Sequence, residues 1–136
     1  MKSATDVRAS KPTLVVALLL VHFACGNPIE PSQVVGGWDA KEGHFDGIQI
    51  QLMSRGSELT GVACRYSGLT LIWSGQPVSV SKDNRVTFEA PPPSQQGTFV
   101  GKFTSDGKQI QGSYTGIAGS KLVFERTGLG TCDFAR

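Results

Sequence analysis

The segment Gly47-Ile48-Gln49-Ile50-Gln51-Leu52 alternates apolar and polar residues with a period of two. Such alternation is typical of a β-strand with one buried and one solvated face, because successive side chains point to opposite sides. Similar segments recur along the chain, separated by turn residues, as in β-sandwiches and β-barrels. We expect strands near 34–40, 47–54, 58–66, 69–74, 77–81, 84–89, 97–104, 109–115 and 120–126, of which two or three can merge.

The segments between these strands favour short turns. Arg55-Gly56 and Ser105-Asp106-Gly107 suit hairpin turns, since glycine adopts the positive φ that such turns require. The proline-rich segment 90–96 cannot be a central strand, because consecutive prolines offer no N–H donors, and it predicts a stiff loop at one rim.

One apolar face on many short strands predicts a closed sheet. No segment after Cys25 shows a convincing amphipathic helix that could cover that face. Closing the sheet buries the face and removes the edges, so we predict an all-β, antiparallel up-and-down meander barrel of about eight strands. The face predicted to point inward includes Ile48, Leu59, Leu69 and the aromatic residues Trp38, Trp73, Phe88, Phe99, Phe103, Tyr114 and Phe124.

The N-terminus has the layout of a secretory signal peptide. Lys2, Arg8 and Lys11 precede an apolar run at 14–21, which is shorter than the ~20 residues of a membrane-spanning helix. These cations account for the formal net charge of +2, and the charged side chains after position 24 balance. Nucleic-acid binding is therefore not expected, because it normally requires a basic surface.

The stretch Phe23-Ala24-Cys25-Gly26 resembles a bacterial lipobox, with His22 where that family usually has leucine. The resemblance implies that Cys25 is diacylated and becomes the mature N-terminus. If the source is Gram-negative, Gly26 rather than aspartate after the cysteine favours the outer membrane by the same resemblance, and we expect the protein to face the periplasm there. We therefore expect a signal peptide over 1–24, a lipidated tether over 25–33 and a barrel domain over 34–136.

Cys64 and Cys132 remain once Cys25 is assigned to the anchor. An exported protein meets an oxidising compartment, which favours one disulfide between them over two unpaired thiols. Cys64 has the opposite parity to Leu59 and Ala63, so its side chain is expected on the outside of the barrel.

Two segments at the ends of the predicted barrel resemble the lipocalin and fatty-acid-binding (calycin) pattern. They are Gly36-Gly37-Trp38 and Leu122-Val123-Phe124-Glu125-Arg126. The resemblance implies that Gly36 and Trp38 open the first strand and that Arg126 packs across Trp38 to close one end. The chain departs from that pattern by its shorter mature length and by lacking a C-terminal helix and a second lipocalin signature.

Catalytic and metal chemistry find little support. After position 24 the only histidine is His44, and the acidic residues around it suit a solvated loop better than a metal site. A Ser–His–acid triad would need the same histidine, and no Gly-x-Ser-x-Gly elbow is present. The carboxylates Glu58, Glu89 and Glu125 all have outward parity. We expect no enzyme activity, no metal and no cofactor.

Binding is the better-supported class, and three hypotheses are open. The first is an envelope-anchored carrier of a small apolar ligand, with the inward aromatic residues lining its pocket. The second is a protein-binding barrel, such as an inhibitor of a lysozyme or protease, acting through the rim loops 90–96 and 67–68. The third is a structural envelope protein with a filled core. An open interior favours the first hypothesis, and a packed interior favours the others.

Overall fold

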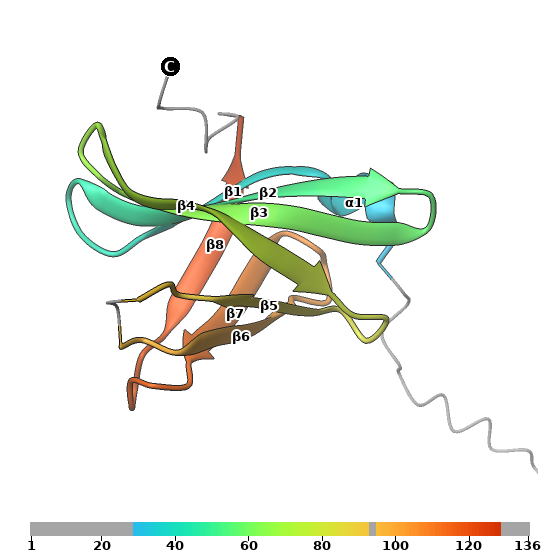
Figure 1. Cartoon of the computed structure of the whole chain (residues 1–136). Coiled ribbons are helices and arrows are strands. Elements are labelled where there is room, and N and C mark those ends of the chain that lie inside the picture. The colour runs from blue at the N-terminus through green and yellow to red at the C-terminus, as the bar shows by residue number, and fades with distance from the viewer. Residues whose placement is uncertain (1–28, 93–94, 129–136) are drawn as a thin grey trace, which may run out of the picture.

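The computed structural model describes residues 29–92 and 95–128. Within them, a short helix precedes eight antiparallel strands that close into a barrel in chain order (Figure 1). This confirms the predicted up-and-down meander. The elements are α1 (Pro31–Val34), β1 (Gly36–Lys41), β2 (Asp46–Arg55), β3 (Glu58–Ser67), β4 (Thr70–Val80), β5 (Arg85–Glu89), β6 (Thr98–Phe103), β7 (Gln109–Tyr114) and β8 (Leu122–Thr127).

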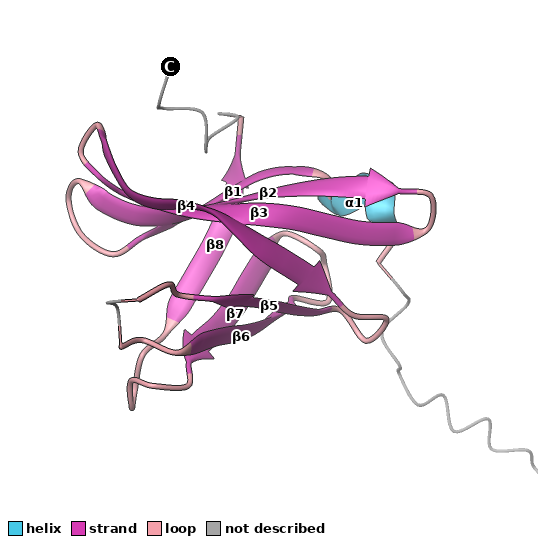
Figure 2. Cartoon of the chain, viewed as in Figure 1, coloured by secondary structure: helices cyan, strands magenta, loops and turns pink. Residues whose placement is uncertain are grey.

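The barrel has two different ends. At one of them, which we call the α1 end, the helix lies beside the turn between β2 and β3 (Figure 2). At the opposite end, which we call the mouth, four connections surround the barrel opening. They are the segments 42–45, 68–69, 90–97 and 115–121, and the structure describes all of them except positions 93 and 94.

The first predicted strand begins later than expected. Val34 ends α1 instead of opening a strand, because Pro31 sits in the first turn of the helix, where its missing N–H costs nothing. Gly36 then turns the chain into β1 with a φ of +123°, a conformation that other residues rarely adopt. The indole Nε1 of Trp38 donates a hydrogen bond to the Val34 carbonyl at 2.9 Å and ties the helix to the strand.

The predicted strands 69–74 and 77–81 form one continuous strand, β4. Ala63 pairs with Gln76 and Arg65 pairs with Trp73, so two residues of β4 lie opposite one residue of β3. This β-bulge contains Gly75, whose φ is +71°. The extra residue reverses the parity of β4, and Trp73 and Val78 therefore both pack toward the core despite their odd separation.

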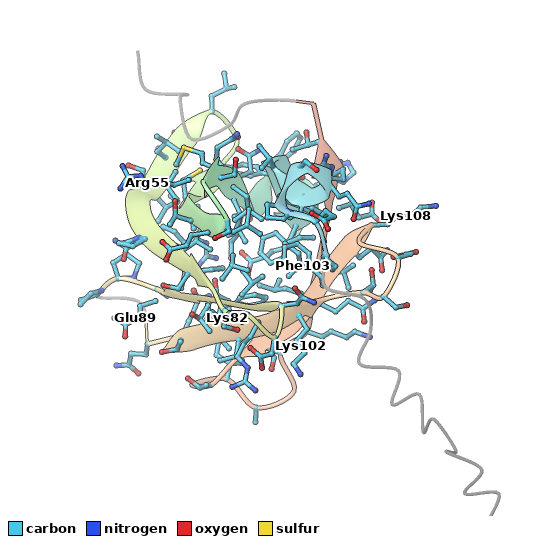
Figure 3. All side chains as sticks on the ribbon, turned by 90° about the vertical axis from the view of Figure 1, so that its right-hand side faces the viewer. Arg55, Lys82, Glu89, Lys102, Phe103 and Lys108 are labelled. Carbon is cyan, nitrogen blue, oxygen red and sulfur yellow. The ribbon has the colours of Figure 1, made fainter. Side chains whose placement is uncertain are left out.

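The centre of the barrel is filled by stacked and edge-on aromatic rings. The Phe99 ring lies 4.9 Å from the Phe88 ring and 5.3 Å from the Phe124 ring, measured between centroids. Gly101 and Gly112 make room for it, because a Cβ on either would come within 2.7 Å of the Phe99 ring. Viewed from the α1 end, side chains occupy the barrel interior (Figure 3).

Two residues differ from their expected environments. Leu69 was predicted to face inward but is 90% exposed, because it lies in the tight turn after Gly68 and not in a strand. Cys64 has outward parity but is fully buried, opposite Gln49 in the β2–β3 register. Cys132 lies outside the described residues, so the disulfide stays a prediction.

We predict that Gly112→Ala destabilises the barrel while Gly43→Ala does not. The new Cβ at position 112 would lie 2.3 Å from the Val100 carbonyl oxygen, whereas at position 43 its nearest neighbour is at 3.7 Å. Overpacking of this kind costs roughly 1–3 kcal/mol. Urea unfolding of both variants measures the difference, and equal midpoints would contradict the packing described for Phe99.

Candidate functional site

The strongest candidate site lies inside the mouth, where several strands place aromatic and polar side chains. Trp73 of β4 and Arg65 of β3 are direct neighbours in the strand register. Tyr114 ends β7 and pairs with Phe99 of β6. Phe88 of β5 pairs with Phe99 from the other side. The site is therefore built from the five consecutive strands β3 to β7.

Two polar groups at this site are buried without a hydrogen-bond partner. They are the indole Nε1 of Trp73 and the phenol oxygen of Tyr114, and the Tyr114 residue is only 4% exposed. An unsatisfied buried donor costs about 1–3 kcal/mol, and native proteins hold few of them. Such groups mark a place where a partner outside the chain can bind.

Phe88 contacts both of the rings that carry these unpaired groups. Its ring centroid is 6.2 Å from that of Trp73 and 6.1 Å from that of Tyr114, with the tyrosine edge-on. Phe88 also stacks on Phe99, so the floor of the site is an apolar aromatic surface. A few polar groups converging on an apolar surface are the usual composition of a small-molecule site.

An ion pair lies close to the tyrosine. The Arg65 guanidinium is 3.3 Å from a carboxylate oxygen of Glu42, which belongs to the loop between β1 and β2. Burial raises the pKa of the Tyr114 phenol, the nearby Glu42 carboxylate raises it further, and Arg65 opposes the shift. Tyr114 therefore keeps its proton at neutral pH and can donate a hydrogen bond.

Two surface hollows compete as binding sites. A recess of about 280 Å³ opens at the mouth beside Tyr114, between Glu42 and Leu122. A larger groove of about 730 Å³ lies at the α1 end, where Leu59 and Val78 form part of its lining. None of the unpartnered buried side-chain atoms belongs to the lining of the larger groove. We therefore place the candidate site at the mouth.

The predicted pocket residues separate into two groups. Phe88, Phe99, Trp73 and Tyr114 gather at the mouth through the ring contacts described above. The others lie deeper or nearer the α1 end: the Trp38 and Phe103 rings are 5.7 Å apart, and Phe124 packs beneath Phe99. The role of each as a pocket residue stays a prediction.

The pair Trp38 and Arg126 lies at the α1 end. The Arg126 guanidinium carbon is 5.0 Å from the centre of the Trp38 ring. The same guanidinium donates a hydrogen bond to the Val35 carbonyl at 2.8 Å. A cation held over an indole is worth roughly 0.5–2 kcal/mol, so this pair stabilises the α1 end and takes no part in the candidate site.

The sequence did not predict that Glu42 pairs with Arg65 at this site. It also did not predict that the Trp73 indole N–H and the Tyr114 hydroxyl lack hydrogen-bond partners. Parity placed both aromatic residues inside, but whether a buried N–H or O–H finds a partner depends on distances across the barrel. The acidic residues around His44 are the one weak metal cluster that the sequence suggests. Over residues 29–92 and 95–128, no group of three or more His, Cys, Asp or Glu side chains is placed to hold a metal ion.

The chain has no match among protein-family models, curated proteins or solved structures. The described part of the chain contains no helix long and apolar enough to cross a membrane. The candidate site is therefore interpreted from its own geometry.

We predict opposite effects on stability for two tyrosine variants. Tyr114→Phe removes a hydroxyl that has no partner, so the free energy of unfolding should stay equal or rise by about 1 kcal/mol. Tyr66→Phe removes the hydrogen bond from the Tyr66 hydroxyl to Asp39 at 2.8 Å and should cost roughly 1 kcal/mol. Urea unfolding without added ligand compares them, and a destabilised Tyr114→Phe would show that its hydroxyl has a partner.

Proposed function

We propose that this protein is a non-catalytic binding protein that holds a small, largely apolar ligand at the mouth of its barrel. The observation that carries the proposal is the pair of unpartnered buried groups, Trp73 Nε1 and Tyr114 OH, whose rings both contact Phe88. A ligand that satisfies both removes a cost already present in the folded chain.

The chemistry of the two groups restricts the ligand. An indole N–H only donates, and a protonated phenol donates readily, so the ligand carries at least one hydrogen-bond acceptor. Phe88 and Phe99 offer an apolar surface beneath, which favours a hydrophobic body. Because Arg65 is already paired with Glu42, the site does not depend on a negative charge in the ligand.

The calycin resemblance supports the same proposal. The chain has a closed meander barrel and an arginine over the tryptophan of the first strand. Barrels of about eight strands enclose either a filled core or one small ligand. Here the centre is filled around Phe99, so the binding site that we propose is shallow and lies above that ring.

We predict that protein extracted from its native envelope in mild detergent carries a small molecule detectable by native mass spectrometry. Tyr114→Phe and Trp73→Phe should lose the bound mass, because each removes a hydrogen-bond donor from the ligand. Lys82→Ala, in the groove at the α1 end, is the matched control and should keep it. A bare mass for the unaltered protein, or equal retention in all variants, would overturn the proposal.

A protein partner is the second candidate, and one observation favours it. Phe45 is 71% exposed and Leu69 is 90% exposed, on two mouth loops that are joined by a hydrogen bond from Gly68 N–H to the Phe45 carbonyl. Adjacent exposed apolar side chains often mark an interaction surface. This surface would serve the protein-binding hypothesis, including inhibition of a lysozyme or protease, if no small molecule is found.

We further propose that the protein is exported and anchored as an outer-membrane lipoprotein through Cys25, with Cys64 and Cys132 joined. Positions 1–28 and Cys132 lie outside the described residues. The support is the lipobox resemblance and the cysteine count. Two or more acyl chains at one site would hold the protein firmly on a membrane, because one chain alone binds only marginally.

The anchor has a direct test. In bacteria that express the full chain, an alkyne-bearing fatty acid should label the protein, and Cys25→Ser should abolish the labelling. Cys132→Ser is the control and should keep the label, since this position is not the predicted acylation site. Labelling that survives Cys25→Ser would refute the lipoprotein assignment.

A further inference from the structure

The barrel wall has a seam between β4 and β5. Their ladder contains only the pairs Ser79–Thr87 and Val80–Val86, although β4 has 11 residues. A hydrogen bond from Ser81 N–H to the Arg85 carbonyl continues the contact toward the α1 end. Toward the mouth the two strands separate, as Figure 1 shows to the left of their meeting point.

Pro77 explains why the ladder stops. The register of the two pairs, continued by one step of two residues, would place Pro77 opposite Glu89. Arg85 directs its carbonyl toward β4, so Thr87 and Glu89 direct their backbone groups to the same side. Because proline has no N–H, Pro77 cannot donate the ladder hydrogen bond to the Glu89 carbonyl.

The bulge in β4 also helps to separate β4 from β5 toward the mouth. It lies at positions 74–75, within the part of β4 that has no pairs with β5, and Gly75 takes a positive φ there. Bulges bend a strand and increase its local twist. The bulge therefore turns the mouth half of β4 along β3 and away from β5.

The seam holds a hollow in the outer surface of the wall. A slot of about 300 Å³ lies between the two strands, with Gln76, Pro77, Ser79, Thr87, Phe88, Glu89 and Thr98 as its lining. Val78 is buried inside the barrel, so its alternate neighbour Gln76 shares the inward face, while Pro77 shares the outer one. Side chains of both faces therefore line the slot, with Gln76 and Phe88 as its inward-facing members.

Phe88 is the most deeply buried of the residues that line the slot. This side chain is 2% exposed, and its ring contacts both Trp73 and Tyr114. The Phe88 side chain therefore lines the slot and also contacts the two rings that carry the unpartnered polar groups. A rotation of that side chain would connect the outer surface with the candidate site.

We propose that the slot between β4 and β5 is a side entrance for the ligand and that the Phe88 ring is its gate. The proposal rests on the ligand site assigned above and adds the route to it. The ligand class that fits is a narrow amphiphile with an acceptor group and a slim apolar part. A slim apolar part can pass the slot beside Pro77 and Phe88, and the acceptor group then reaches Trp73 and Tyr114.

Stopped-flow fluorescence with cis-parinaric acid, a fluorescent linear fatty acid, as the probe tests this route on the full chain in mild detergent. Pro77→Val restores the missing N–H and should extend the ladder toward Glu89. Thr87→Phe should fill the slot by its ring whether or not the backbone closes. In both variants the association and dissociation rate constants should fall together by roughly tenfold, because a closed gate slows entry and exit alike. The Kd should stay within about twofold, since the two rate changes cancel.

Ser113→Phe is the matched control, because Ser113 is exposed on the intact β6–β7 ladder, and its rate constants should equal those of the unaltered protein. Unchanged rate constants in both slot variants would show that the probe enters through the mouth and would overturn the side entrance. A changed Kd with an unchanged association rate constant would also overturn it, because the slot would then be part of the bound state. Failure of the proposed function is separate: the Kd for the probe would then be insensitive to Tyr114→Phe.

Discussion

The pairing of β1 with β8 is the constraint on which the other features depend. Three residue pairs join these strands, with Trp38 opposite Arg126 at their centre. The Arg126 guanidinium covers the Trp38 ring and also holds the Val35 carbonyl, so one side chain ties the last strand to the segment that enters the first. Closure removes two sheet edges and gives every inward side chain neighbours on all sides.

Closure also limits the interior space that side chains leave unfilled. Phe99 occupies the centre because Gly101 and Gly112 have no side chains to exclude it. The same filling brings Phe88 up against Trp73 and Tyr114 near the mouth, where no chain atom is left to satisfy their polar groups. A filled centre and a shallow site above it are therefore two results of one packing arrangement.

The fold was largely predictable because its cause is local. The alternation at 47–52 and the recurrent turn glycines express a period-two pattern that each segment carries by itself. The merged strand was less predictable, since a bulge at 74–75 reverses parity and imitates a break. The burial of Cys64 and the exposure of Leu69 depend on what covers the outer wall and on where a turn falls. The site itself needed distances between β4 and β7, which no single segment encodes.

The seam between β4 and β5 costs the fold the backbone hydrogen bonds that a longer ladder would make. An open ladder leaves backbone groups of Glu89 without a strand partner, and a residue with an N–H at position 77 would offer one. Proline at an open edge also blocks the addition of a foreign strand, and the charge of Glu89 acts in the same sense. In the proposal made above, the seam admits a small molecule, while Pro77 and Glu89 keep it closed to other polypeptide strands. Such a seam suits the proposed ligand site, because the centre of the barrel is filled around Phe99 and leaves room only near its wall and mouth.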